Sequence, residues 1–139
     1  MKTSQEYKSF NNEKTIAELQ YNMQRFRANL QFLKEDLDFL NFLVNTSIYK
    51  ENMRDLFENL ERFKKEILKA FNKCDMLITE ANFQASQITQ KIECDELACD
   101  NYFISAQNNL EKNIYDFIIE SYLLKTEMYN YLKGVIKTD

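Results

Sequence analysis

The chain has 139 residues with 18 basic and 22 acidic side chains, and its net charge of −4 argues against non-specific binding to nucleic acid or anionic lipid. Its hydrophobic content of 45%, with eleven phenylalanines and eight tyrosines, is too high for a disordered chain. No segment approaches the roughly 18 apolar residues of a membrane span, and the N-terminus lacks the apolar region of a signal peptide. We therefore expect a single cytoplasmic domain over residues 1–139, with no membrane or nucleic-acid partner.

Helix-breaking residues are almost absent from the sequence. There is no proline, and the one glycine, Gly134, lies five residues from the end of the chain. Proline removes a helix hydrogen bond, and glycine costs about 1 kcal/mol in a helix interior. The composition therefore predicts long, uninterrupted helices.

The first helix is predicted over residues 4–45. Thr3 and Glu6 fit a capping box at its start, and apolar residues then recur alternately three and four positions apart, the heptad spacing of a bundle helix. The short polar residues Asn45, Thr46 and Ser47 compete for backbone hydrogen bonds and predict a turn. This first ladder of apolar residues consists of Ile16, Leu19, Met23, Phe26, Leu30, Leu33, Leu37, Leu40 and Val44.

The second helix is predicted over residues 48–92, from a ladder with the same spacing. Its last third is the weakest part of the pattern, and a break near Asn82 to Ser86 would turn the fold into a four-helix bundle with one short member. The ladder consists of Tyr49, Met53, Leu56, Leu60, Phe63, Ile67, Ala70, Cys74, Leu77, Ala81, Gln84 and Ile88.

The third helix is predicted over residues 96–136. The apolar pattern lapses between Glu93 and Asn101, where good N-cap residues predict a second turn. Near the C-terminal end, Gly134 either supplies a left-handed residue or lets the helix fray. Three helices of similar length joined by short turns favour an antiparallel, up-down-up three-helix bundle of coiled-coil-like helices. The third ladder consists of Phe103, Gln107, Leu110, Ile114, Phe117, Ser121, Leu124, Met128, Tyr131 and Val135.

The third helix carries more apolar residues than one ladder needs. Tyr115, Ile118, Ile119, Tyr122 and Tyr129 lie beside the ladder and widen the apolar face. Either this face contacts two neighbouring helices within the bundle, or it forms a surface for self-association or for a partner protein, to which tyrosine is well suited. The other two helices also carry apolar residues beside their ladders, but these widen the apolar face less. They are Phe32, Phe39, Phe42 and Leu43 on the first helix, and Phe57, Leu68, Phe71 and Ile78 on the second.

The sequence offers little catalytic chemistry. There is no histidine, which excludes Ser-His-Asp triads, histidine zinc sites and the Glu-x-x-His motif of di-iron bundles. One glycine cannot form a phosphate-binding loop. We therefore expect neither an enzyme nor a cofactor.

Three cysteines and one basic cluster are the remaining candidates for chemistry. Cys74 has a ladder position and is most simply a core residue. Cys94 and Cys99 lie in the acidic second turn, where an acidic cap is favoured over a redox pair or a metal site, because their spacing is uncommon for zinc. A basic patch on one outer face of the second helix is diluted by glutamates, so a solvated face is favoured over a site for an acidic partner. The patch consists of Arg62, Lys65, Lys69 and Lys73.

These observations favour a non-enzymatic helical bundle that acts through protein–protein contact and self-associates through the aromatic face of the third helix. The alternative is a ligand-binding or sensory bundle, in which aromatic side chains line a cavity for a small apolar molecule.

Overall fold

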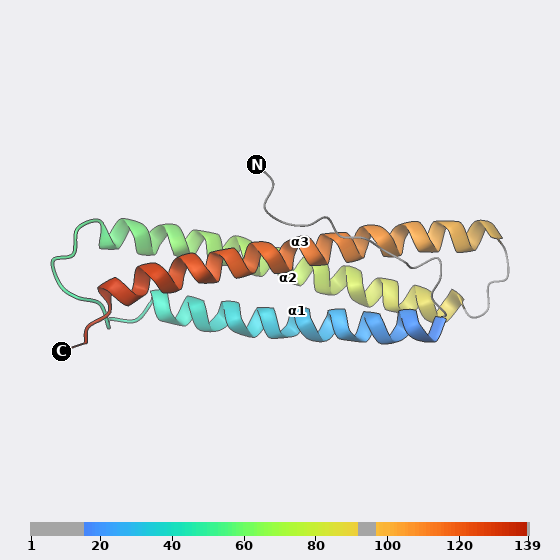
Figure 1. The fold of residues 1–139 in the computed structure, drawn as a ribbon, viewed down its shortest axis with the longest axis horizontal. Coiled ribbons are helices and arrows are strands. Elements are labelled where there is room, and N and C mark those ends of the chain that lie inside the picture. The colour runs from blue at the N-terminus through green and yellow to red at the C-terminus, as the bar shows by residue number, and fades with distance from the viewer. Residues whose placement is uncertain (1–15, 92–96, 139) are drawn as a thin grey trace.

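The computed structural model describes residues 16–91 and 97–138, which form three α-helices: α1 (Ile16–Val44), α2 (Leu56–Lys91) and α3 (Leu97–Val135). The helices lie side by side in an elongated bundle (Figure 1). α2 packs against both neighbours, and the contact between α1 and α3 is the least extensive of the three. The predicted up-down-up three-helix bundle is confirmed.

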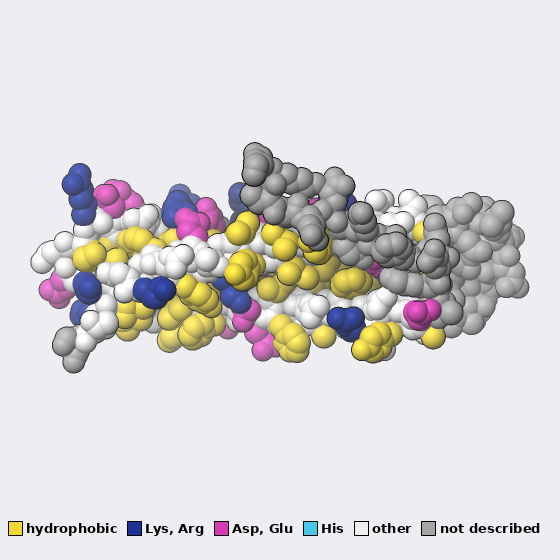
Figure 2. All heavy atoms as spheres, in the orientation of Figure 1, with side chains coloured by type: hydrophobic (Ala, Val, Ile, Leu, Met, Phe, Trp, Pro, Cys, Tyr) yellow, Lys and Arg dark blue, Asp and Glu magenta, His cyan; other side chains and the backbone are white. Residues whose placement is uncertain are grey.

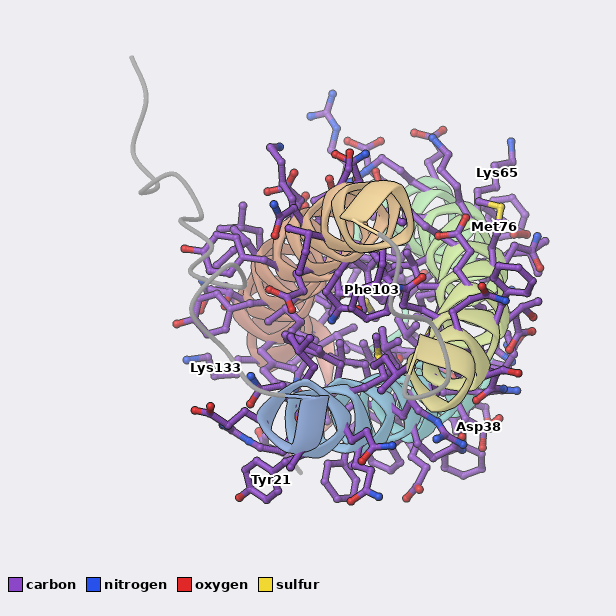
Figure 3. The ribbon with its side chains drawn as sticks, turned by 90° about the vertical axis from the view of Figure 1, so that its right-hand side faces the viewer. Tyr21, Asp38, Lys65, Met76, Phe103 and Lys133 are labelled. Atoms are coloured by element: carbon purple, nitrogen blue, oxygen red, sulfur yellow. The ribbon has the colours of Figure 1, made fainter. Side chains whose placement is uncertain are left out.

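The three predicted ladders supply the core. Viewed along the bundle, the helices stand around a shared interior, with Phe103 pointing inward and Tyr21 and Lys65 pointing outward (Figure 3). α2 runs through Asn82 without a break, so the four-helix alternative is wrong. The largest fully buried apolar side chains are Leu19, Met23, Leu30, Leu37, Leu40, Phe63, Ile67, Ile88, Ile114, Phe117 and Met128.

The first predicted turn is confirmed, because α1 ends at Val44. The backbone nitrogen and the hydroxyl of Thr46 both donate to the carbonyl oxygen of Leu43, at 3.3 and 2.8 Å, and the Asn45 side-chain amide donates to the Asn41 carbonyl at 2.7 Å. These bonds satisfy carbonyls that the end of a helix leaves without partners. The predicted start of this helix over residues 4–15, with its capping box at Thr3 and Glu6, lies outside the described residues.

The start predicted for the second helix is wrong, since α2 begins at Leu56 instead of residue 48. Asn52 and Asp55 have φ angles of 62° and 59°, a left-handed conformation that interrupts a helix and that these two residue types tolerate. Tyr49 and Met53 therefore belong to the α1–α2 connection. Tyr49 is still buried, and its hydroxyl donates to the carbonyl of Leu43.

The α1–α2 connection is tied to the end of α3 by backbone hydrogen bonds. Lys50 N donates to Val135 O at 2.7 Å, and Lys137 N donates to Ile48 O at 2.8 Å, which makes Tyr49 and Ile136 an antiparallel bridge. The chain after α3 therefore lies against this connection, as Figure 1 also shows.

The third helix, predicted over residues 96–136, is confirmed by α3, but the turn predicted between Glu93 and Asn101 extends too far along the chain. α3 begins at Leu97, so residues 97–101 are helical, while residues 92–96 lie outside the described part of the chain. Gly134 lies within α3 and does not have a positive φ angle, so the left-handed role considered for it is also wrong.

Two phenylalanines of α2 test how the core stabilises the bundle. Phe63 is fully buried and Phe57 is 73% exposed. We expect Phe63→Ala to lower the free energy of unfolding by about 3–5 kcal/mol, through lost burial and the cavity left behind. The matched control, Phe57→Ala, should change it by no more than about 0.5 kcal/mol. Urea denaturation followed by circular dichroism measures both; equal losses would contradict this assignment of the core.

Candidate functional site

The residues predicted as an interface on α3 lie partly at the surface. Tyr122 and Tyr129 are 63% and 45% exposed, whereas Tyr115, Ile118 and Ile119 are half-buried. Ile118 packs against the core. Of the five residues predicted as an interface, the three half-buried ones help to cover the core of the bundle. The other two, Tyr122 and Tyr129, are exposed to solvent.

A second group of aromatic residues is exposed on α1. Phe32, Phe39 and Phe42 are 63%, 54% and 61% exposed, and the rings of Phe39 and Phe42 stack with their centroids 6.2 Å apart. From the sequence pattern, these three residues were a weaker candidate for an interface than the apolar residues of α3. Its exposure is nevertheless as large, because these residues lie away from the ladder that packs against α2.

An ion pair links the two helices that carry these aromatic groups. The ammonium of Lys125 on α3 lies 2.8 Å from a carboxylate oxygen of Asp36 on α1. Residues three or four positions apart share a helix face. By this spacing, Phe32 and Phe39 flank Asp36 on α1, and Tyr122 and Tyr129 flank Lys125 on α3.

We call these exposed residues of the two helices the aromatic surface. Figure 2 shows hydrophobic side chains over the middle of α3 and along α1 on the same side of the molecule. Contiguous exposed apolar surface of this kind marks interaction sites in soluble proteins. The aromatic surface consists of Phe32, Phe39, Phe42, Tyr122 and Tyr129.

The ion pair keeps the centre of the aromatic surface electrically neutral. The hydrogen bond from Lys125 to Asp36 raises the pKa of this lysine, an effect larger than the opposing one of desolvation. The lysine therefore keeps its positive charge at neutral pH, 2.8 Å from the Asp36 carboxylate.

The predicted basic patch on α2 is largely neutralised. Arg62 lies 3.4 Å from Glu66 and 2.8 Å from Glu127, and Lys73 lies 3.1 Å from Glu120. Within the described part of the chain, only Lys65 and Lys69 of this set have no carboxylate partner; both are exposed. The structure thus does not assemble the four side chains into one cluster of unpaired positive charge.

Among the described residues, four polar side chains are buried in the core, and three of them have predicted ladder positions. Gln84, Gln107 and Ser121 are ladder residues and are buried, as is Glu111, which was missed. The Gln107 amide donates to the Glu111 carboxylate at 2.8 Å. Glu111 could have been identified from the sequence, because it lies four residues after Gln107 and therefore on the same face of the helix.

The cysteines give no sign of a reactive centre in the described residues. Cys74 is buried, its thiol donates to the carbonyl of Leu30 at 3.3 Å, and burial raises its pKa to about 11. The thiolate, which is the nucleophile, is therefore scarce at neutral pH. Cys94 lies outside the described residues, as does the side chain of Cys99. Among the described residues, no group of three or more histidine, cysteine or acidic side chains is placed to hold a metal ion.

Comparison with protein-family models, curated proteins and solved structures found no match to this chain. Over the described residues, no helix is long and apolar enough to cross a bilayer.

The buried thiol leads to a pH prediction. An unfolded Cys74 loses its proton near pH 9, whereas the folded one holds it to about pH 11. Since the folded-state pKa is the higher one, the stability from the neutral thiol is complete below pH 9 and is lost as the pH rises towards 11. We expect the stability difference between the wild type and Cys74→Ala to shrink over this range in urea denaturation. A constant difference would contradict burial of the thiol.

Proposed function

We propose that this is a non-enzymatic, cytoplasmic protein that acts through protein–protein contact and self-associates through the aromatic surface. One observation carries the proposal: aromatic rings of α1 and α3 are exposed together around the Lys125–Asp36 ion pair. Tyrosine and phenylalanine are enriched at protein interfaces, where their large rings contribute most of the contact. A reducing compartment agrees with the free thiol of Cys74.

A second copy of the chain suits this surface for two reasons. In a two-fold dimer the same patch meets itself, so each aromatic residue contributes twice to the buried area. The paired charges at its centre avoid the like-charge repulsion that two copies of a charged patch would meet. The surface is elongated along two parallel helices, so a second bundle can lie along it and bury α1 and α3 together.

Charge introduced into the aromatic surface should dissociate the assembly. We expect the wild type to be a dimer at tens of micromolar by size exclusion with light scattering. Phe39→Glu and Tyr122→Glu should each raise the dissociation constant by about tenfold or more, equivalent to about 1.4 kcal/mol, because a carboxylate would be buried without a partner.

Phe57→Glu is the matched control, since Phe57 is an exposed aromatic residue of α2 outside the aromatic surface. This variant should remain as dimeric as the wild type. A wild type that is strictly monomeric at these concentrations, or a dimer unaffected by Phe39→Glu and Tyr122→Glu, would contradict self-association through this surface.

A further inference from the structure

The outer side of α2 carries a line of exposed residues that belong neither to the core nor to the aromatic surface. Leu68, Met76 and Phe83 are 62%, 58% and 65% exposed. At about 100° per residue, they lie on the side of α2 opposite its ladder, and Met76 points away from the bundle in Figure 3. We call this line the α2 strip, and it consists of Leu68, Asn72, Met76, Thr79 and Phe83.

The centre of this outer face is uncharged from Leu68 to Phe83, although 29% of the residues in the chain are charged. Its three large apolar side chains alternate with the two short polar ones. The solvent-facing side of a bundle helix normally carries charged residues. An uncharged line along a helix is instead typical of a surface that packs against another helix.

The order of residues along the α2 strip allows it to pair with itself. In a two-fold, antiparallel pair, each residue faces the one that lies equally far beyond the axis in the other copy. With the axis level with the midpoint of residues 75 and 76, Leu68 faces Phe83 and Asn72 faces Thr79. Met76 then lies close to its own counterpart. Apolar residues therefore meet apolar ones, and polar residues meet polar ones.

The charges along one edge of the α2 strip also match under this symmetry. Lys69 and Glu80 are both exposed on that edge, and neither forms an ion pair within the described part of the chain. A two-fold axis brings the same edge of both helices together, so Lys69 of each copy lies within one turn of Glu80 of the other. Within one copy these residues are eleven positions, or about 17 Å, apart and cannot pair.

The opposite edge of the strip has one acidic residue close to the axis. Two copies of Asp75 would approach each other there, and like charges oppose association. In each copy, however, the ammonium of Lys34 on α1 lies 2.8 Å from a carboxylate oxygen of Asp75. Each Asp75 therefore arrives at the axis with its charge already compensated.

We propose that two copies of the chain pair in antiparallel orientation through the α2 strip. Met76 lies at the two-fold axis, and two Lys69–Glu80 pairs form between the copies, one on each side of it. This contact is separate from the aromatic surface, because the α2 strip faces away from the side between α1 and α3. It does not depend on the dimer proposed above.

The contact is small. One helix of each copy takes part over about four turns, which buries less than the roughly 800 Å² per partner of a standard interface. Pairing through the α2 strip is therefore weak and forms at higher concentration than pairing through the aromatic surface. When both contacts form, each bundle has two neighbours, and assembly continues beyond a dimer.

The test uses the full chain with Phe39→Glu and Tyr122→Glu, which block the aromatic surface. Sedimentation equilibrium of this background variant up to millimolar concentration should show a reversible monomer–dimer equilibrium. Adding Met76→Glu should raise the dissociation constant about tenfold or more, because two carboxylates would then meet at the axis. Phe57→Glu is the matched control on the same helix, 73% exposed and outside the α2 strip, and should leave the constant unchanged.

A charge exchange tests the antiparallel register in the same background. Lys69→Glu and Glu80→Lys each place like charges opposite one another, and each should raise the dissociation constant about threefold or more. The chain with both changes has opposite charges facing again and should dimerise as the background variant does. Since the two residues cannot pair within one copy, such a recovery reports contact between copies. Circular dichroism checks that every variant keeps its helices.

Three results would overturn the proposal: a background variant that stays monomeric at millimolar concentration, a dimer unaffected by Met76→Glu, or a double charge variant that dimerises as weakly as the single ones. A wild-type dimer with a monomeric background variant would leave the aromatic surface as the site of self-association and reject the α2 strip. The reverse outcome, a background variant that dimerises as tightly as the wild type, would reject the aromatic surface alone.

Discussion

The structure depends on the packing of α2 against both of its neighbours. Each helix has one ladder of apolar residues, and in a three-helix bundle that ladder must serve two contacts. α2 meets this demand by packing against both α1 and α3, while the contact between α1 and α3 is the least extensive of the three. Within residues 16–91 and 97–138, the side of the bundle between α1 and α3 is therefore the least closely packed. Both the Lys125–Asp36 ion pair and the exposed aromatic rings lie there.

The heptad spacing predicted the core well, because burial in a bundle follows directly from helix periodicity. Spacing alone did not reveal where α2 begins. Tyr49 and Met53 continue the ladder at the correct intervals, and Tyr49 is indeed buried, but it reaches the core from a connection. What holds that connection is remote in sequence: the backbone of Lys50 and Ile48 bonds to the end of α3. A local pattern carries no information about such a partner, and left-handed Asn52 and Asp55 have ordinary polar side chains that many helices also contain.

The candidate site, too, could be predicted only where it depends on residues that are close together in the sequence. Residues beside a ladder can be identified from sequence, and Tyr122 and Tyr129 were identified in this way. How far each is exposed depends on where the neighbouring helices lie, so Ile118 and Ile119 are half-covered while Phe32 and Phe39, which had seemed secondary, are not. The ion pair that joins the two groups links residues 89 positions apart. Within the sequence of its own helix, neither Lys125 nor Asp36 can be distinguished from the other charged residues that face solvent.

A groove between α2 and α3, with Ala70 and Ser121 among its lining residues, lies where stability alone would favour larger residues. Filling a core position with additional carbon adds burial worth about 0.8 kcal/mol per methylene, and leaving a hydroxyl without a partner adds a cost. Ala70 and Ser121 lack the additional burial that larger side chains would give, and the Ser121 hydroxyl has no hydrogen-bond partner among the described residues. Because Ser121 and Tyr122 are adjacent in sequence and about 100° apart around α3, one turn of this helix lines the groove on one side and presents the aromatic surface on another.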